Sequence, residues 1–217
     1  MIPIRDSRRR KPSQSRARAT AEAIQQAFLQ ILAQKSYSRI SIREVISLAG
    51  VGVGSFYEYF SSKDALAAIC IRRQIREIAV AMSDCVATRG SEPLHLRVDA
   101  LLEAQARAPL AEPEQWAAIF MIERQISRIE AFRSLYAEFV QLWVTMLGAG
   151  SDWPREVSVE EAAFAAHTMV YSLVSQTLLT RTSRPDGAAV RRLLRTAVHG
   201  YLSVLAPMAY RLHRFDI

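Results

Sequence analysis

Two short helical segments on either side of a glycine turn constrain the fold of this chain more than any other feature. Residues 41–44 (Ser-Ile-Arg-Glu) have the capping-box pattern that starts a helix, and Gly50 is placed to end it. Residues 53–60 can form a second helix of about two turns. Helices this short are unstable alone, so they must pack on an earlier helix, which the apolar spacing predicts over residues 17–35. The three segments together have the outline of a helix-turn-helix.

The rest of the chain is also predicted to be helical. Only 8 Gly and 8 Pro occur in 217 residues, and half of the residues are hydrophobic. A fourth helix, capped near Ser61–Asp64, is expected to run to about residue 86. The later helices are expected at 93–107, 113–124, 129–148, 159–180 and 187–206, with one turn at Ala108-Pro109. We therefore predict an all-α protein of about nine helices.

Positive charge is concentrated in the first third of the chain. Residues 1–76 hold 14 Lys/Arg and 5 Asp/Glu, a net charge of +9, whereas the remaining residues have a net charge of −2. Residues 1–16 include the run Arg8–Lys11 and little to bury, which predicts a flexible basic arm. The asymmetry favours a polyanionic partner, either nucleic acid or an anionic membrane. The alternative is a solvated basic tail on an unrelated fold.

The sequence predicts a soluble, cytoplasmic protein with no membrane partner. The stretch 162–180 lacks Asp, Glu, Lys and Arg, but its seven polar residues make it too polar for a lipid-facing span. The N-terminus has no apolar signal core. Cys70 and Cys85 fall on one predicted helix, roughly 22 Å apart and beyond disulfide reach, as expected in a reducing compartment.

No catalytic constellation is present in the sequence, so we expect neither an enzyme nor a bound metal or cofactor. The four histidines, His95, His167, His199 and His213, are scattered without metal-ligand spacing. Phosphate loops, dinucleotide fingerprints and nucleophile elbows are also missing. Because His167 lies in a largely apolar segment, we interpret it as a core or interface histidine.

Residues 41–66 resemble the DNA-binding signature of the TetR/AcrR (tetracycline-repressor) family. The most specific part is Gly-Ser-Phe-Tyr-Glu-Tyr-Phe at 54–60, followed by Lys63, Ala65 and Leu66. With the first helix the resemblance covers residues 17–75. It implies a helix-turn-helix DNA-binding domain behind the basic arm, followed by a helical ligand-binding and dimerisation domain. The three parts are expected to span residues 1–16, 17–62 and 63–217.

The resemblance and residue chemistry together nominate DNA contacts. Gly54 would let the backbone approach DNA, Ser55 and Tyr57 can hydrogen-bond, and Lys63 can attract phosphate. Many family members carry a polar residue and then Lys where this chain has Gly52 and Val53, although Val53 can touch a thymine methyl. The complete candidate set is Arg16, Arg18, Thr20, Ser41, Arg43, Val53, Gly54, Ser55, Tyr57, Tyr59 and Lys63. A structural role is the alternative for the aromatic residues, above all for Phe60.

The resemblance further implies a homodimeric repressor that a small molecule releases from a near-palindromic operator. Large apolar side chains in the later helices suit an apolar or aromatic effector, although each can equally be ordinary core. These candidates are Met82, Trp116, Phe120, Met121, Tyr136, Phe139, Trp143 and Met169. The last two helices have apolar faces wide enough for an intersubunit four-helix bundle. The alternative is that both helices only fill the core of the monomer. The alternative function is a constitutive architectural DNA-binding protein without an effector, which would lack a cavity among its later helices.

Overall fold

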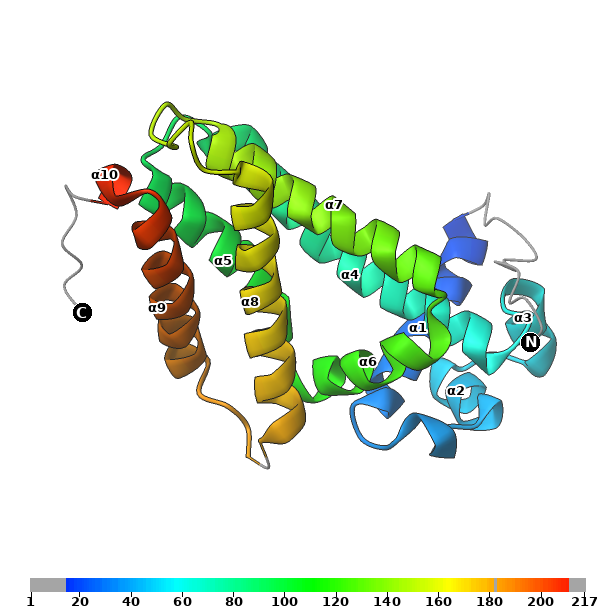
Figure 1. The fold of residues 1–217 in the computed structure, drawn as a ribbon. Helices are drawn as coiled ribbons and strands as arrows, with labels where there is room; N and C mark the ends of the chain where they lie inside the picture. The colour runs from blue at the N-terminus through cyan, green and yellow to red at the C-terminus, as the bar shows by residue number, and fades with distance from the viewer. Residues whose placement is uncertain (1–14, 182, 211–217) are drawn as a thin grey trace. The chain divides into compact units, whose positions relative to one another are not determined.

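The computed structural model describes residues 15–181 and 183–210, and within these ranges it contains ten α-helices, one 3-10 turn and no strand (Figure 1). The all-α prediction is therefore confirmed for this part of the chain. Most of the predicted basic arm, residues 1–14, lies outside the described residues.

The helices form two compact units. The first unit contains the described residues up to Ile75 together with Glu114–Arg128, and the second contains Arg76–Pro113 and the described residues from Ile129 onward. The helix α4 (Lys63–Arg89) contributes residues to both units. These units divide the chain differently from the predicted boundary at residue 63, which stays a functional hypothesis.

The first unit is built on short helices that share an aromatic core. It comprises α1 (Ser15–Leu32), the 3-10 turn η1 (Tyr37–Arg39), α2 (Ile42–Ala49), α3 (Val53–Tyr59), the start of α4, and α6 (Pro113–Ile126). The helix α1 contacts both α2 and α3. Phe28 of α1, Phe56 of α3 and the following Phe60 are fully buried. Because α2 and α3 are too short to be stable alone, this shared core fixes their orientation.

The second unit consists of longer helices. It comprises the end of α4 and α5 (Leu94–Ala111), α7 (Ile129–Gly148), α8 (Val159–Thr180), α9 (Gly187–Leu205) and α10 (Pro207–Tyr210). The helix α8 packs on both α7 and α9, and α5 packs on α7, α8 and α9 (Figure 1). The buried Arg97 of α5 connects this helix to the end of α7 and to the loop between α7 and α8. It donates to the Met146 carbonyl of α7 at 2.7 Å and pairs with Asp152 of the loop.

The helix boundaries mostly follow the sequence pattern, with one error. The predicted turn at Ala108-Pro109 is wrong, because α5 continues to Ala111 with Pro109 buried inside it. Proline removes one backbone donor, but near the end of a helix this affects only the last turn. The amide of Glu112 still bonds the Ala108 carbonyl at 3.2 Å. The 3-10 turn η1 and the short helix α10 were not predicted.

Both cysteines lie on α4 and both are free, as expected; Cys70 is buried and Cys85 is half-buried. Within the described ranges, the helices are all too short or too polar to traverse a lipid bilayer.

Candidate nucleic-acid interface

The helix α2 begins with the predicted capping box. The Ser41 hydroxyl accepts a hydrogen bond from the Glu44 amide at 3.3 Å, and the Glu44 carboxylate accepts one from the Ser41 amide at 2.9 Å. Lys35, just after α1, pairs with the same carboxylate. This lysine and the bonds from Ser41 lower the pKa of Glu44 to about 2. The start of α2 is therefore fixed by local hydrogen bonds and tied to the end of α1.

The turn between α2 and α3 depends on one glycine conformation. Gly50 has φ of 66°, the left-handed region in which side chains with a Cβ are strained. Its amide bonds to the Ile46 carbonyl, and the Val51 amide bonds to the same oxygen at 3.0 Å. The chain then enters α3 at Val53 without a side-chain cap, because the capping residue is Gly52.

Buried aromatic residues hold α3 in place. Phe56 and Phe60 are fully buried, and their ring centroids lie 5.7 Å apart. Tyr59, one of the predicted DNA contacts, is only 6% exposed and lies against Phe60. Burial of Tyr59 favours a packing role over contact with DNA, and the packing alternative for Phe60 is confirmed.

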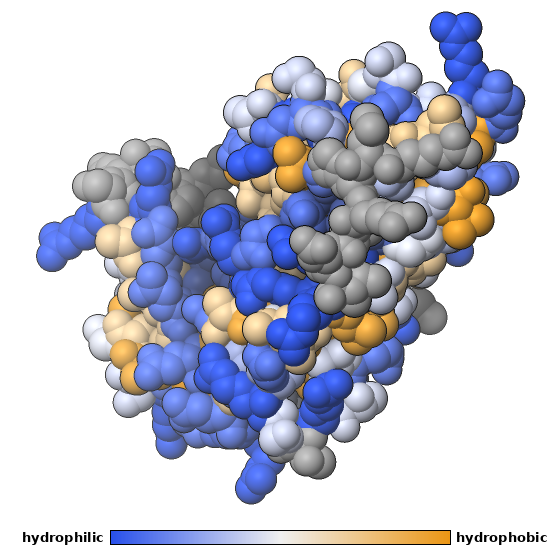
Figure 2. Space-filling model, turned by 90° about the vertical axis from the view of Figure 1, so that its left-hand side faces the viewer, coloured by the Kyte–Doolittle hydropathy of each residue, from blue (hydrophilic) through white to orange (hydrophobic). Residues whose placement is uncertain are grey.

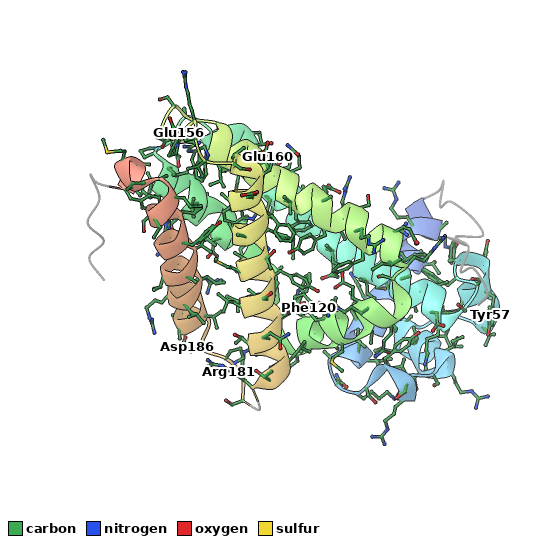
Figure 3. The ribbon with its side chains drawn as sticks, in the orientation of Figure 1. Tyr57, Phe120, Glu156, Glu160, Arg181 and Asp186 are labelled. Atoms are coloured by element: carbon green, nitrogen blue, oxygen red, sulfur yellow. The ribbon has the colours of Figure 1, made fainter. Side chains whose placement is uncertain are left out.

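The opposite side of α3 is open to solvent and almost uncharged. Val53 is 55% exposed and Tyr57 is 42% exposed. Figure 3 shows Tyr57 on the outer side of α3. Gly54 is exposed between them, and Ser55 is half-buried. Glu58 is the only charged residue of the helix. An exposed helix face set by a buried aromatic core is the geometry that a recognition helix needs in order to enter the major groove.

The Lys63 side chain makes its hydrogen bonds within the first unit. Its ammonium donates to the carbonyls of Tyr37 at 3.1 Å and Ile40 at 3.0 Å, and lies 4.4 Å from the centre of the Tyr37 ring. The Tyr37 hydroxyl bonds to Asp64, and burial together with this carboxylate raises the pKa of Tyr37. The start of α4 thus holds the connection between α1 and α2. These two bonds use part of the donor capacity of the Lys63 ammonium. Its contact with a DNA phosphate remains a prediction.

The other predicted DNA contacts lie at two helix starts. Arg16 and Arg18 are exposed on the first turns of α1, and the half-buried Thr20 donates to the Arg16 carbonyl at 3.1 Å. Ser41 and Arg43 are exposed at the start of α2. Their positions leave each of these side chains accessible, and their contacts with DNA remain predictions.

The predicted effector residues do not belong to one compact unit. Trp116, Phe120 and Met121 lie on α6 in the first unit. The remaining five, which belong to the second unit, are Met82, Tyr136, Phe139, Trp143 and Met169. Met82 and Trp143 are fully buried, whereas Met121 is 57% exposed. A single pocket lined by all eight residues is therefore not proposed.

Within the second unit, an aromatic cluster joins α7 to α8. The Tyr136 ring lies 4.4 Å from the His167 ring and 6.0 Å from the Tyr171 ring. The Phe139 ring lies 5.3 Å from the His167 ring. The Tyr136 hydroxyl and the Thr168 hydroxyl are 2.6 Å apart. Two of the predicted effector residues, Tyr136 and Phe139, thus share one cluster.

A buried polar relay runs behind this cluster. The Trp143 indole donates to the Gln105 side-chain oxygen at 3.0 Å, and the Gln105 amide nitrogen lies 3.1 Å from Nδ1 of His167. His167 is 3% exposed, and burial lowers its pKa to about 4, so the ring is neutral near pH 7. The prediction of a core histidine is confirmed. Gln105 was missed, because a single glutamine on an expected helix gives no signal of burial.

One groove lies entirely within the first unit. It has a volume of about 460 Å³ and separates the α1–η1 turn from α6. Leu32 and Tyr37 line one side, and Ala118, Met121 and Ile122 line the other. This groove was not anticipated from the sequence, because its two walls are about 80 residues apart along the chain.

A short capped helix, a left-handed glycine turn and an exposed second helix define a helix-turn-helix DNA-binding protein. Residues 24–69 match the family model described as bacterial regulatory proteins, tetR family. The sequence resemblance to the TetR family of transcriptional regulators is therefore confirmed for the DNA-binding segment.

Similar proteins agree with this assignment. YxbF of Bacillus subtilis strain 168, an uncharacterized HTH-type transcriptional regulator, is 27% identical over 164 residues, which is 65% of this chain and 43% of YxbF. The regulator Rv0767c of Mycobacterium tuberculosis H37Rv, also uncharacterized, is 29% identical over 155 residues, 70% of each chain. The matched region thus covers less than half of YxbF.

Solved structures support the fold. The TetR-family regulator PfmR from Thermus thermophilus has a TM-score of 0.63 at 15% identity, covering 84% of this chain and 96% of PfmR. The regulator FadR from Bacillus subtilis, solved in complex with stearoyl-CoA, has a TM-score of 0.65 at 14% identity, covering 82% and 96%. The structural likeness extends well beyond the matched DNA-binding segment.

Proposed function

We propose that this regulator is a homodimeric repressor that leaves a near-palindromic operator in the cytoplasm when an uncharged, largely apolar molecule binds its second unit. The observation that carries the dimer is an exposed apolar face on α8 and α9. Phe164 of α8 is 55% exposed, and Leu193 and Val204 of α9 are 43% and 78% exposed. Figure 2 shows that hydrophobic patches interrupt a mainly hydrophilic surface on the face that it draws.

The geometry of α9 supports a second copy of the chain as the partner. Its inner face is buried in the unit through Val190, Leu194 and Val198. Leu193 and Val204 lie about three turns apart on the outer face. A methyl group added at Gly200, which lies between them, would have no described atom within 4 Å beyond its own stretch of helix. A mid-helix glycine costs about 1 kcal/mol relative to alanine. The packing of a single chain does not require glycine at this position. Close approach of a helix from a second subunit would require it.

The effector class follows from the aromatic cluster. Tyr136, Phe139 and Tyr171 offer ring faces, and the two tyrosines add hydroxyl groups. Burial keeps the His167 ring among them neutral near pH 7. Uncharged aromatic or long apolar molecules fit such surroundings better than ions do. FadR, similar in fold, was solved with stearoyl-CoA, whose acyl chain is an example of the apolar class.

The helix α4 is the proposed route between effector and DNA. It is continuous from Lys63, which bonds the connection before α2, to Arg89 in the second unit. A ligand shifts the operator equilibrium only if it binds the DNA-incompetent state more tightly. We therefore expect effector binding to change the placement of α4 and, through Lys63, of the reading helices.

The test is operator release. The purified protein would first be used to select DNA from a random pool, and release from the best site would then be titrated with uncharged aromatic and long-chain apolar compounds. Tyr136→Ala should weaken release by the active compound without weakening DNA binding, whereas Leu96→Ala, which trims a 42% exposed side chain on α5 of the same unit, should change neither. An operator bound equally tightly with every compound would favour the constitutive architectural protein instead.

A further inference from the structure

The exposed face of α3 has an unusual composition for a surface that meets a polyanion. The helix reads Val-Gly-Ser-Phe-Tyr-Glu-Tyr and contains no Lys or Arg. Arginine and lysine make the commonest specific contact with DNA, a pair of hydrogen bonds to guanine. That contact is not available from α3, so this helix must distinguish bases by other chemistry.

Val53 occupies the position with the best access to base edges. It is the first residue of α3, and its side chain is 55% exposed. The N-terminal residues of a recognition helix contact the bases in the major groove. An isopropyl group has no hydrogen-bonding atom, and it has a strongly preferred rotamer in a helix. Its natural counterpart in the major groove is the one apolar group there, the 5-methyl group of a pyrimidine.

The residues on either side of Val53 leave its side chain unobstructed. A methyl group added at Gly52 or Gly54 would have no described atom within 4 Å beyond its own stretch of chain. Neither glycine has the positive φ of Gly50. The fold of the unit therefore gives no reason for these glycines, although Gly54 lowers helix stability relative to alanine. Bare backbone on both sides lets the Val53 side chain reach the floor of the groove.

We propose that Val53 reads the 5-methyl group of a pyrimidine in each half-site. This inference rests on the proposed function, because it assumes that α3 enters the operator. The methyl group has two natural sources, thymine and 5-methylcytosine. Contact with one methyl group is worth roughly a fourfold change in affinity, from the free energy of burying one carbon.

The experiment uses the full chain and the operator selected from random DNA. Each thymine is replaced in turn by deoxyuridine, which pairs identically but lacks the 5-methyl group. One position in each half-site should lose about three- to fivefold in affinity, and the loss should disappear for Val53→Ala. Val80→Ala, which trims a valine of similar exposure (52%) on α4, should retain the full loss.

A second arm separates the two sources. At the sensitive position, 5-methylcytosine paired with guanine is compared with unmodified cytosine. Tighter binding of the methylated base shows that the methyl group is read whatever pyrimidine bears it, whereas equal binding restricts the readout to thymine. The inference alone is overturned if the operator binds tightly and no deoxyuridine substitution lowers the affinity. It is also overturned if the affinity loss at the sensitive position persists in Val53→Ala. Absence of sequence-selective DNA binding overturns the proposed function as well.

Discussion

The outer faces of α3 and α9 share one unusual feature but lie in different surroundings. Each exposes a valine and a glycine, Val53 and Gly54 on α3, and Val204 and Gly200 on α9. The helix α3 is 7 residues long and depends on Phe56 and Phe60, whereas α9 is 19 residues long and packs along α5 and α8. An external partner would explain an exposed glycine on a helix in both places. We propose DNA as this partner for α3 and a second subunit for α9.

The largest effect is expected from placing a charge on the outer face of α9. Val204→Glu should leave the 78% exposed site folded but separate the subunits. A monomer has only one reading head, so operator affinity should fall by roughly 10²–10⁴-fold. Sedimentation and operator titration measure the two effects. Val80→Glu is the control, and a monomeric Val204→Glu that keeps full affinity would show that one head is sufficient.

Acid should lower the free energy of unfolding of the second unit through protonation of His167. Its pKa is about 4 in the folded state, below the ordinary value of 6.5, so the unfolded chain binds the proton first. The stability is complete above pH 6.5 and falls as the pH drops towards 4, by up to about 3 kcal/mol. His167→Gln keeps an acceptor for Gln105 but cannot be protonated, so urea unfolding of this variant should depend less on pH across that range. Parallel profiles for the two proteins would argue against a neutral His167.

Gly54→Ala should separate stability from function within the first unit. Alanine fits the open space and should stabilise α3 by about 1 kcal/mol. Operator affinity should nevertheless fall by about tenfold, because the added methyl group holds the backbone away from DNA. Thermal unfolding and operator titration of the same preparation test both signs. Unchanged affinity would remove the close-approach role of Gly54.

The smallest effect is expected at Glu44. Its folded pKa of about 2 lies below the ordinary 4.5, so its contribution to stability is present above pH 4.5 and is lost as the pH falls through 2. The carboxylate is exposed to solvent, so the change should be slight. Glu44→Gln should flatten the acid limb of the unfolding curve of the first unit. An identical acid limb would show that the pair with Lys35 does not contribute.

The sequence predicted features that depend on neighbouring residues. Ser41 and Glu44 are three residues apart, and Gly50 ends the same helix, so the capping box and the left-handed turn follow from local chemistry. Contacts between distant residues were not predicted. No pattern among neighbouring residues indicates that Lys63 donates to the Tyr37 and Ile40 carbonyls. The same is true of the hydrogen bonds that Gln105 makes with Trp143 and His167.

Site prediction followed the same division. The exposed recognition side of α3 was predicted from a family signature, and burial then separated Tyr57, which faces solvent, from Tyr59, which does not. The effector residues were selected only as large apolar groups. That criterion does not distinguish the α6 side chains Trp116 and Met121 in one unit from Tyr136 in the other. Contact information across the chain is what the sequence lacked.

The most direct test of the account is footprinting of the purified protein on DNA selected from a random pool, combined with a measurement of the number of chains bound to each site. We predict two chains on a near-palindromic site whose half-sites lie about one helical turn apart, with protection reduced by Tyr57→Ala. One chain on an asymmetric site, or binding without sequence preference, would contradict a dimer that reads DNA through α3.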